Sequence, residues 1–269
     1  MKGRWREMEN HRGKVFFITG ASSGIGKRIA LALAGSGATL LLAARNEKSL
    51  TEVANQIRAQ GGEAFIYPVD LSRKEEVEKM SRLIQSRFGR VDLLINNAGF
   101  GVFDPVVRGD PEDWEKMMTV NYLASVRLIR AFLPQMLSQR EGHIINVASI
   151  AGKLGSPFFA GYNASKFAIV GFSESLYIEL LGTGVNVTTI CPGPIDTPFF
   201  KDGEMERVLG KRGAKFLLPP EKVVRAILKA IEKKPREVIL PRYMKLVIHM
   251  KNLFPKAFSF LSARLFPKG

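Results

Sequence analysis

Short apolar runs that alternate with segments of helical length restrict the fold of this chain more than any other feature. We expect the apolar runs to form strands, at residues 15–18, 39–44, 64–69, 91–95, 143–147, 185–190 and 238–240. The segments between them have helical spacing, at residues 27–34, 49–60, 74–88, 111–137, 160–181 and 220–233. Apolar strands separated by helical connections are typical of parallel sheets buried on both faces. The sequence therefore predicts an α/β fold with one doubly wound parallel sheet and helices on both faces.

The length of 269 residues suits one large domain with an appended segment. We expect a single domain over residues 1–240 and a C-terminal extension over residues 241–269. The stretch 194–219 lacks a clear period, which predicts either a mobile segment or a functional lid. The single cysteine, Cys191, excludes an intramolecular disulfide, and the three histidines are too scattered in the sequence to form a metal site.

The net charge of +15 is concentrated near the C-terminus. Residues 201–269 contain 17 Lys or Arg and six Asp or Glu, and residues 238–269 contain six basic residues and no acidic one. This asymmetry favours an anionic partner: a membrane surface, a phosphorylated or acyl-carrier substrate, or nucleic acid.

Residues 243–266 read as a basic amphipathic helix. Its apolar residues recur at helical spacing, at Tyr243, Leu246, Val247, Met250 and Leu253. Three interpretations remain open: a helix lying in a membrane interface, a helix against another subunit or over a long-chain substrate, or a simply solvated tail. Nucleic-acid binding is not expected, because the aromatic residues share this stripe with Leu, Val and Met instead of alternating with basic residues.

The sequence shows no targeting or spanning segment. Residues 1–14 are polar and basic, and no uncharged apolar run reaches the roughly 18 residues that a spanning helix needs. We therefore expect a cytoplasmic protein that can also lie peripherally on a membrane surface.

The segment TGASSGIG, residues 19–26, directly follows the first apolar run. Its glycines, Gly20, Gly24 and Gly26, would let the backbone approach a pyrophosphate, with the N–H groups of the next helix facing the anion. Alone, this turn is equally consistent with a simple tight turn. Four further motifs follow along the chain, three at expected strand ends and one in the expected helix at residues 160–181.

These motifs are NNAG at residues 96–99, Ser149 after the fifth strand, YNASK at residues 162–166, and CPGPIDTP at residues 191–198. In this order, they resemble the short-chain dehydrogenase/reductase family over about residues 13–240. The resemblance implies a Rossmann-type fold and hydride transfer between a nicotinamide cofactor and a carbonyl or secondary alcohol. It also implies a homo-oligomer, dimer or tetramer.

Tyr162 and Lys166 lie four residues apart and therefore share one face of a helix. An ammonium group near a phenol favours the phenolate and lowers its pKa, so the pair could exchange a proton with a carbonyl oxygen. Ser149 could hydrogen-bond the same oxygen. The resemblance implies that Asn121 supports the lysine through water. The expected catalytic residues are Asn121, Ser149, Tyr162 and Lys166.

The end of the second strand indicates which nicotinamide cofactor is used. Folds that select NAD tend to place an acidic residue here to bind the ribose 2′-hydroxyl, whereas this chain has Ala44 followed by Arg45. A guanidinium group can bind a 2′-phosphate through two hydrogen bonds. The sequence therefore predicts NADP(H), with NAD(H) the less favoured alternative.

The resemblance implies further cofactor contacts. Asp70 and Leu71 would meet the adenine, Asn97 and Ala98 the adenine ribose, and Ile195 the nicotinamide carboxamide. The full expected set is Gly20, Ser22, Ser23, Gly24, Ile25, Gly26, Arg45, Asp70, Leu71, Asn97, Ala98, Gly99, Tyr162, Lys166, Pro192, Gly193, Ile195 and Thr197.

Large apolar residues near these motifs favour a hydrophobic carbonyl substrate, such as a lipid-derived ketone. They are Phe100, Phe103, Leu154, Phe158, Phe159, Phe199 and Phe200. Residues 199–201 could close over the substrate as a lid. The alternative is a non-catalytic protein that senses NADP(H) or acts as a scaffold on the same fold. The presence of Ser149, Tyr162 and Lys166 together argues for the enzyme.

Overall fold

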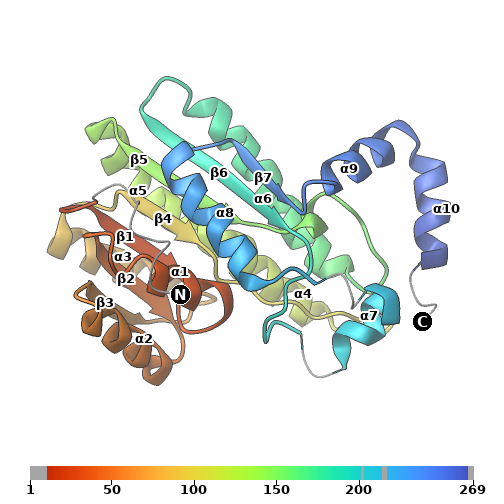
Figure 1. Ribbon diagram of the computed structural model, residues 1–269, viewed down its shortest axis with the longest axis horizontal. Coiled ribbons are helices and arrows are strands. Elements are labelled where there is room, and N and C mark those ends of the chain that lie inside the picture. Colours follow the sequence, from red (N-terminus) through yellow and green to blue (C-terminus); the bar gives the residue numbers. More distant parts are fainter. Residues whose placement is uncertain (1–10, 201–202, 214–216, 266–269) are drawn as a thin grey trace.

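Seven strands form one parallel sheet in the order β3-β2-β1-β4-β5-β6-β7 (Figure 1). The computed structural model describes residues 11–200, 203–213 and 217–265. The strands are β1 (Val15–Thr19), β2 (Thr39–Ala44), β3 (Glu63–Pro68), β4 (Leu93–Asn96), β5 (Gly142–Val147), β6 (Val185–Pro192) and β7 (Glu237–Leu240). The order reverses between β1 and β4, so the predicted doubly wound sheet is confirmed.

Helices cover both faces of the sheet because neighbouring strand residues point to opposite sides. Phe16 and Ile18 of β1 pack in a cluster with one set of helices, and Phe17 packs in a second cluster with the other set. The first set is α1 (Gly24–Ala32), α2 (Glu47–Ala59) and α8 (Pro220–Lys233). The second is α3 (Lys74–Phe88), α5 (Ala124–Gln139) and α6 (Ala160–Glu179).

The helix expected over residues 111–137 is divided by a π-helical turn. It consists of α4 (Pro111–Met118), the π turn Thr119–Leu123, and α5. The side chain of Asp110 caps α4 by accepting a hydrogen bond from the backbone N–H of Glu112. Such turns occur often at functional sites, and this one contains the buried Asn121.

The predicted helical C-terminal extension is confirmed, although it forms two helices where the sequence predicts one. They are α9 (Met244–Leu253) and α10 (Pro255–Leu265), and they extend from the body at the end of the molecule remote from β3 (Figure 1). Pro255 begins the second helix because proline lacks an N–H group and its ring would clash with a preceding helical turn. Residue 266 of the expected helix lies outside the described residues.

The aperiodic stretch at residues 194–219 contains a short helix, α7 (Glu204–Gly213). Gly210, with a φ of 71°, interrupts it. Lys201, expected to belong to a lid, lies outside the described residues. Within the described part of the chain, no helix has the combination of length and apolar character needed to cross a membrane.

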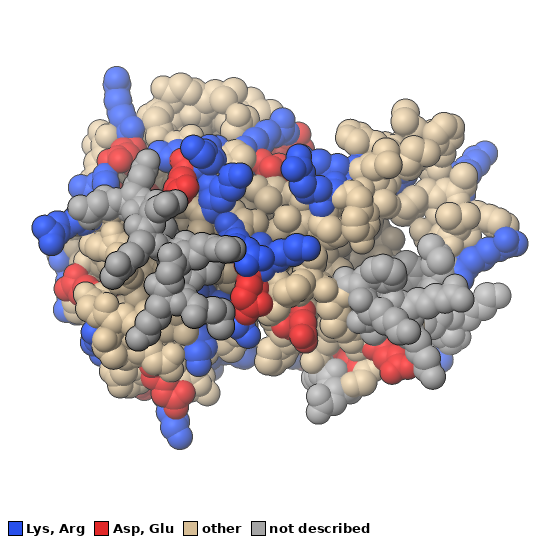
Figure 2. Space-filling model, viewed as in Figure 1, with Lys and Arg blue, Asp and Glu red and all other residues tan. Residues whose placement is uncertain are grey.

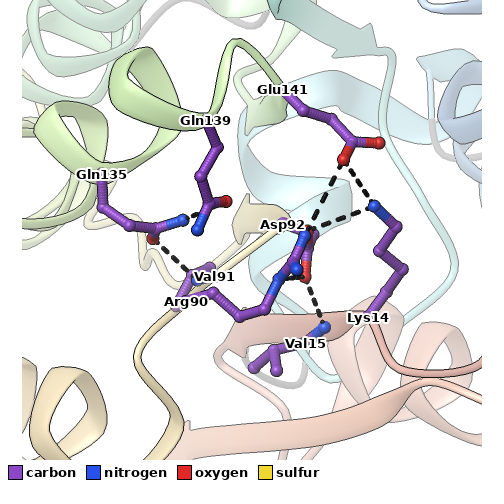
Figure 3. Close-up of polar contacts among 8 residues, drawn as sticks. All are labelled: Lys14, Val15, Arg90, Val91, Asp92, Gln135, Gln139 and Glu141. Carbon is purple, nitrogen blue, oxygen red and sulfur yellow. Dashed lines mark hydrogen bonds and ion pairs between the residues drawn. The ribbon is translucent and has the colours of Figure 1, made fainter.

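A cluster of charged side chains ties the amino ends of β1 and β4 together (Figure 3). The buried carboxylate of Asp92 accepts a hydrogen bond of 2.8 Å from the backbone N–H of Val15 and pairs with Arg90. Lys14 lies 3.6 Å from the same carboxylate and 2.6 Å from that of Glu141. This cluster fixes the sheet edge opposite the one at which the strand motifs meet.

Candidate active site

The carboxyl ends of β1, β4, β5 and β6 surround a cavity of about 470 Å³. A crevice at this edge, where the strand order reverses, is the usual ligand site of an open parallel sheet. Fourteen of the twenty residues expected from the sequence line it: Gly20, Ser23, Gly24, Ile25, Asn97, Ala98, Gly99, Ser149, Tyr162, Lys166, Pro192, Gly193, Ile195 and Thr197. The other six are not in its lining: Ser22, Gly26, Arg45, Asp70, Leu71 and Asn121.

The glycine turn provides a backbone surface at the start of α1. Gly20 and Gly24 have φ values of 66° and 52°, a conformation that side chains with a Cβ disfavour. Ser23 is the N-cap of α1, but its side chain makes no capping hydrogen bond. Exposed N–H groups at a helix N-terminus suit a phosphate, so these residues fit a dinucleotide pyrophosphate.

Gly26 is required for packing and does not line the cavity. A Cβ at this position would lie 2.2 Å from the carbonyl oxygen of Gly20 and 2.6 Å from Nδ2 of Asn97. The buried Gly26 therefore lets α1 approach the turn closely, which is how it shapes the site.

The segment after β4 is hydrogen-bonded directly to the glycine turn. Asn97 Nδ2 donates to the carbonyl oxygen of Thr19 at 2.9 Å. Thr19 Oγ1 accepts from the backbone N–H groups of Asn97 and Ala98, both at 3.0 Å. Asn97 thus both lines the cavity and holds the ends of β1 and β4 in register.

Tyr162 and Lys166 project from α6 into the cavity and are almost fully buried. Lys166 Nζ lies 5.7 Å from the centroid of the Tyr162 ring and donates a hydrogen bond of 3.2 Å to the carbonyl oxygen of Val147. Ser149 Oγ accepts from the backbone N–H of Ala151 at 3.1 Å, so the short turn after β5 fixes the serine side chain. The turn after β5 and helix α6 therefore bring Ser149, Tyr162 and Lys166 together.

Burial controls the electrostatics of this group. It raises the pKa of the Tyr162 phenol well above its ordinary value, although a hydrogen bond with Ser149 acts in the opposite direction. Burial also lowers the pKa of Lys166 to about 8. The sequence argument left out desolvation, which is the dominant influence on the pKa of Tyr162, so the expectation that Lys166 lowers this pKa stays a prediction.

Asn121 lies behind Gly99, outside the cavity lining. Its Oδ1 accepts from the backbone N–H of Phe100 at 3.0 Å, and its Nδ2 donates to the Phe100 carbonyl and to Ser165 Oγ. A Cβ on Gly99 would lie 2.9 Å from Asn121 Oδ1 and 3.4 Å from Lys166 Nζ. Asn121 therefore holds the loop after β4 against α6, beside the lysine.

The residues expected at the adenine end lie beyond this cavity. Arg45 is exposed immediately after β2. Burial tends to raise the pKa of Asp70, but hydrogen bonds from Ser72 and the charges of Arg45 and Arg73 outweigh it, so the pKa is lowered. Arg45 and Asp70 are therefore close enough to interact. Leu71 is buried in a core cluster on one face of the sheet, which explains its absence from the cavity.

A family model described as short chain dehydrogenase matches residues 14–207. This chain belongs to the short-chain dehydrogenases. A fatty acyl-CoA reductase of Acinetobacter baylyi is 37% identical to it over 232 residues, which cover 86% of this chain and 77% of that protein.

Two solved structures of the family extend the comparison. A short-chain dehydrogenase/reductase from Burkholderia phymatum in complex with NAD has a TM-score of 0.83 and 29% identity, covering 93% of this chain and 96% of that one. A metagenomic short-chain oxidoreductase in complex with NADP has a TM-score of 0.72 and 32% identity, covering 85% of this chain and 97% of that one. This short-chain dehydrogenase is thus an oxidoreductase that transfers a hydride. Structures of its family have been solved with NAD and with NADP.

The aromatic residues of the dehydrogenase divide between the cavity and its support. Phe103 is fully buried behind the site, with ring centroids 4.5 Å from Phe159 and 5.5 Å from Tyr162, and like Phe158 it does not line the cavity. The other expected apolar residues do line it: Phe100, Leu154, Phe159, Phe199 and Phe200.

Sequence reasoning did not single out eight of the lining residues: Val147, Ala148, Ile150, Ala151, Ser156, Pro194, Pro198 and Met244. Ser156 lies in the loop between the end of β5 and α6 and could have been suspected from that position. Met244 begins α9, and no pattern in the sequence indicates where that helix docks.

Proposed function

We propose that this short-chain dehydrogenase is an NADP(H)-dependent reductase of apolar ketones. The observation that carries the proposal is the joint presence of Ser149, Tyr162 and Lys166 in the cavity that the glycine turn also lines. A protein that only sensed the cofactor would have no use for an acid–base group at the position of the substrate.

The three side chains have separate roles in the proposed reaction. The reduced nicotinamide, when bound, supplies the hydride that reaches the carbonyl carbon. Tyr162 donates its proton to the carbonyl oxygen, giving a secondary alcohol, while Ser149 orients that oxygen by a hydrogen bond. Lys166 stabilises the phenolate that remains and holds the cofactor ribose. Asn121 positions Lys166 through the loop at Gly99.

The residues that would hold the cofactor are grouped by the part they contact. The backbone of Gly20, Ser23 and Gly24 would bind the pyrophosphate at the N-terminus of α1. Ile195 and Thr197 would meet the nicotinamide carboxamide. Asp70 would meet the adenine through Oδ2, since Ser72 donates to Oδ1.

Arg45 supports a preference for NADP(H), because it is exposed directly after β2 and the last residue of β2 is Ala44, not an acidic residue. We expect Arg45→Asp to raise the KM for NADPH by about tenfold or more, since it removes charge-assisted hydrogen bonds to a 2′-phosphate. The KM for NADH should stay constant or fall. Arg82→Asp, an exposed charge change on α3, is the matched control. An equal change for both cofactors would refute the preference.

The cavity lining supports an apolar substrate, since Phe100, Leu154, Phe159, Phe199 and Met244 contribute to it. The similarity to a fatty acyl-CoA reductase also supports a lipid-derived substrate. The test is NADPH consumption with ketones graded in chain length, for which we expect kcat/KM to rise with length. A flat profile would contradict the apolar substrate. NADPH binding without turnover of any ketone would favour the sensor instead.

We also propose that the dehydrogenase assembles into a homo-oligomer through α5 and α6, and that residues 1–240 carry cofactor binding and catalysis. Exposed apolar side chains support the assembly: Leu137 on α5, Ile178 on α6, and Leu181 just after the end of α6. Light scattering after size-exclusion chromatography should give a multiple of 29.9 kDa. A monomer at micromolar concentration would contradict it.

A further inference from the structure

The C-terminal helices carry a concentration of exposed apolar side chains. Of the fifteen large hydrophobic side chains that are exposed in the described part of the chain, seven lie within residues 243–261. We call these seven the C-terminal surface: Tyr243, Leu246, Met250, Leu253, Phe254, Phe260 and Leu261. So many apolar groups on two neighbouring helices form a patch of the kind that marks an interaction site.

Helix α9 packs against the domain through the side opposite to its exposed apolar residues. Met244 and Ile248 pack against a core cluster that includes Ile169 and Ile239. Lys251 Nζ donates to the carbonyl oxygen of Lys153 at 2.7 Å. These contacts hold α9 in a fixed orientation, so its outer side is presented to the surroundings.

The outer side of α9 is an apolar stripe. On a helix that advances about 100° per residue, Tyr243, Leu246, Met250 and Leu253 fall within a sector of about 80°. That sector lies nearly opposite Met244 and Ile248. Leu246 and Leu253 are 65% and 71% exposed, so the domain itself does not cover the stripe.

Helix α10 also combines exposed apolar side chains with a basic one. Phe260 and Leu261 are exposed, and the Arg264 guanidinium lies 4.1 Å from the centroid of the Phe260 ring. Figure 2 shows uncharged surface bordered by basic side chains where α10 lies in Figure 1. The apolar area is thus extended over two helices that meet at Pro255.

The charged residues of the C-terminal helices themselves are all of one sign. Arg242, Lys245, Lys256 and Arg264 are exposed there, and residues 238–269 contain no acidic residue. Pairing of this surface with the same surface of a second copy would bring these cations against each other. An anionic partner would neutralise these cations. The charge therefore favours an anionic partner over a second copy of this chain.

We propose that the C-terminal surface binds the interface of a lipid bilayer that contains anionic phospholipid. The apolar stripe would enter the boundary between headgroups and acyl chains, and the four cations would lie at the level of the phosphates. The helices would lie along the membrane and would not cross it. The fixed docking of α9 means that the domain is held at a defined angle to the bilayer.

The same helix links the membrane to the cavity, a consequence that rests on the reductase function proposed above. Met244, at the start of α9, lines the cavity, while Leu246 lies two residues further along on the outer side. A long-chain ketone dissolved in the bilayer would therefore be concentrated next to the site that reduces it.

The test is cosedimentation of the full-length protein with vesicles. The probes are vesicles of phosphatidylcholine alone and of phosphatidylcholine with 30% phosphatidylglycerol, at roughly 0.05 M and 0.5 M NaCl. We expect binding to the anionic vesicles at low salt and weaker binding at high salt, where the Debye length falls to about 4 Å. Absence of binding to anionic vesicles at low salt would overturn the proposal.

Two double variants separate the apolar and the charged contributions. Leu246→Ser with Leu253→Ser, and Lys245→Glu with Lys256→Glu, should each weaken vesicle binding by about tenfold or more. The control is Leu83→Ser, on the exposed side of α3, which should bind like the wild type. All these side chains are exposed, so thermal unfolding should stay unchanged and show that each variant is folded.

The outcomes can be told apart from failure of the reductase. If the Leu246 and Leu253 variant binds vesicles like the wild type, or changes the oligomeric state instead, the membrane proposal is refuted. Reduction of a short, water-soluble ketone tests the catalytic function alone and should be unaffected by this variant. Stimulation of a long-chain ketone by anionic vesicles, lost in the variant, would support both.

Discussion

Replacing Lys166 with methionine should make the cofactor-free protein more stable while abolishing catalysis. Burial lowers the pKa of Lys166 from 10.5 to about 8, and within the described residues no carboxylate forms an ion pair with it. The 2.5-unit difference corresponds to about 3 kcal/mol at pH 7, at about 1.36 kcal/mol per unit. Loss of the hydrogen bond to the Val147 carbonyl offsets about 1 kcal/mol. We therefore expect a net gain of about 2 kcal/mol.

The pH dependence of this gain follows from the sign of the shift. Because the folded pKa is lower than the unfolded one, the unfolded chain binds the proton more tightly and the penalty is complete below pH 8. It disappears as the pH rises through the unfolded pKa of 10.5. At pH 10 the remaining penalty is about 1 kcal/mol, which the lost hydrogen bond cancels.

Urea denaturation of wild type and Lys166→Met at pH 7 and pH 10 checks this reasoning, with coincident fluorescence and circular dichroism transitions as the test of two-state behaviour. Lys229→Met, at an exposed position on α8, is the matched control and should give no pH-dependent difference. A destabilised Lys166→Met protein at pH 7, or an equal gain at both pH values, would refute the desolvation argument.

Three further changes separate catalysis from structure. Tyr162→Phe should lower kcat by about a thousandfold, as expected for loss of a general acid. Its affinity for NADPH, measured by fluorescence titration, should stay within about twofold of that of the wild type. Gly26→Ala should lower the free energy of unfolding, measured by urea denaturation, by about 2 kcal/mol and should weaken NADPH binding. The reason is that its Cβ would lie 2.2 Å from the carbonyl oxygen of Gly20. Gly35→Ala, with no atom within 4 Å of the new Cβ, is its control and should be neutral or stabilising. Asp92→Asn should cost about 2 kcal/mol, because it removes the buried carboxylate that pairs with the partly exposed Arg90 and Lys14. It should keep kcat, since Asp92 lies at the opposite edge of the sheet; a fall in kcat without a loss of stability would contradict this.

The sequence was sufficient for the sheet and for most of the site, for one physical reason. Parallel strands end at the same edge, so a motif that follows each apolar run must meet the others in space. Gly20, Asn97, Ser149 and Ile195 follow four different strands and line one cavity. Their meeting could be inferred without knowing a single side-chain contact.

Expectations from local spacing were less reliable where packing decides the outcome. Phe103 lies near the site motifs in sequence, but tertiary packing buries it behind Phe159 and Tyr162. Asn121 has a helical pattern around it, but it lies in a π turn and bonds to the loop at Phe100. Neither outcome has a signature in the spacing of residues.

The sequence by itself determined the α/β class, the glycine turn and the helix that presents Tyr162 and Lys166 on one face, because these follow from local period and strand order. Only the tertiary structure decided how deeply Lys166 is desolvated and which side of α9 faces the domain. Desolvation depends on every group packed around the ammonium, and docking of α9 depends on a cluster formed by β6, β7 and α6. Both are sums over residues distant in the chain, which no local pattern records.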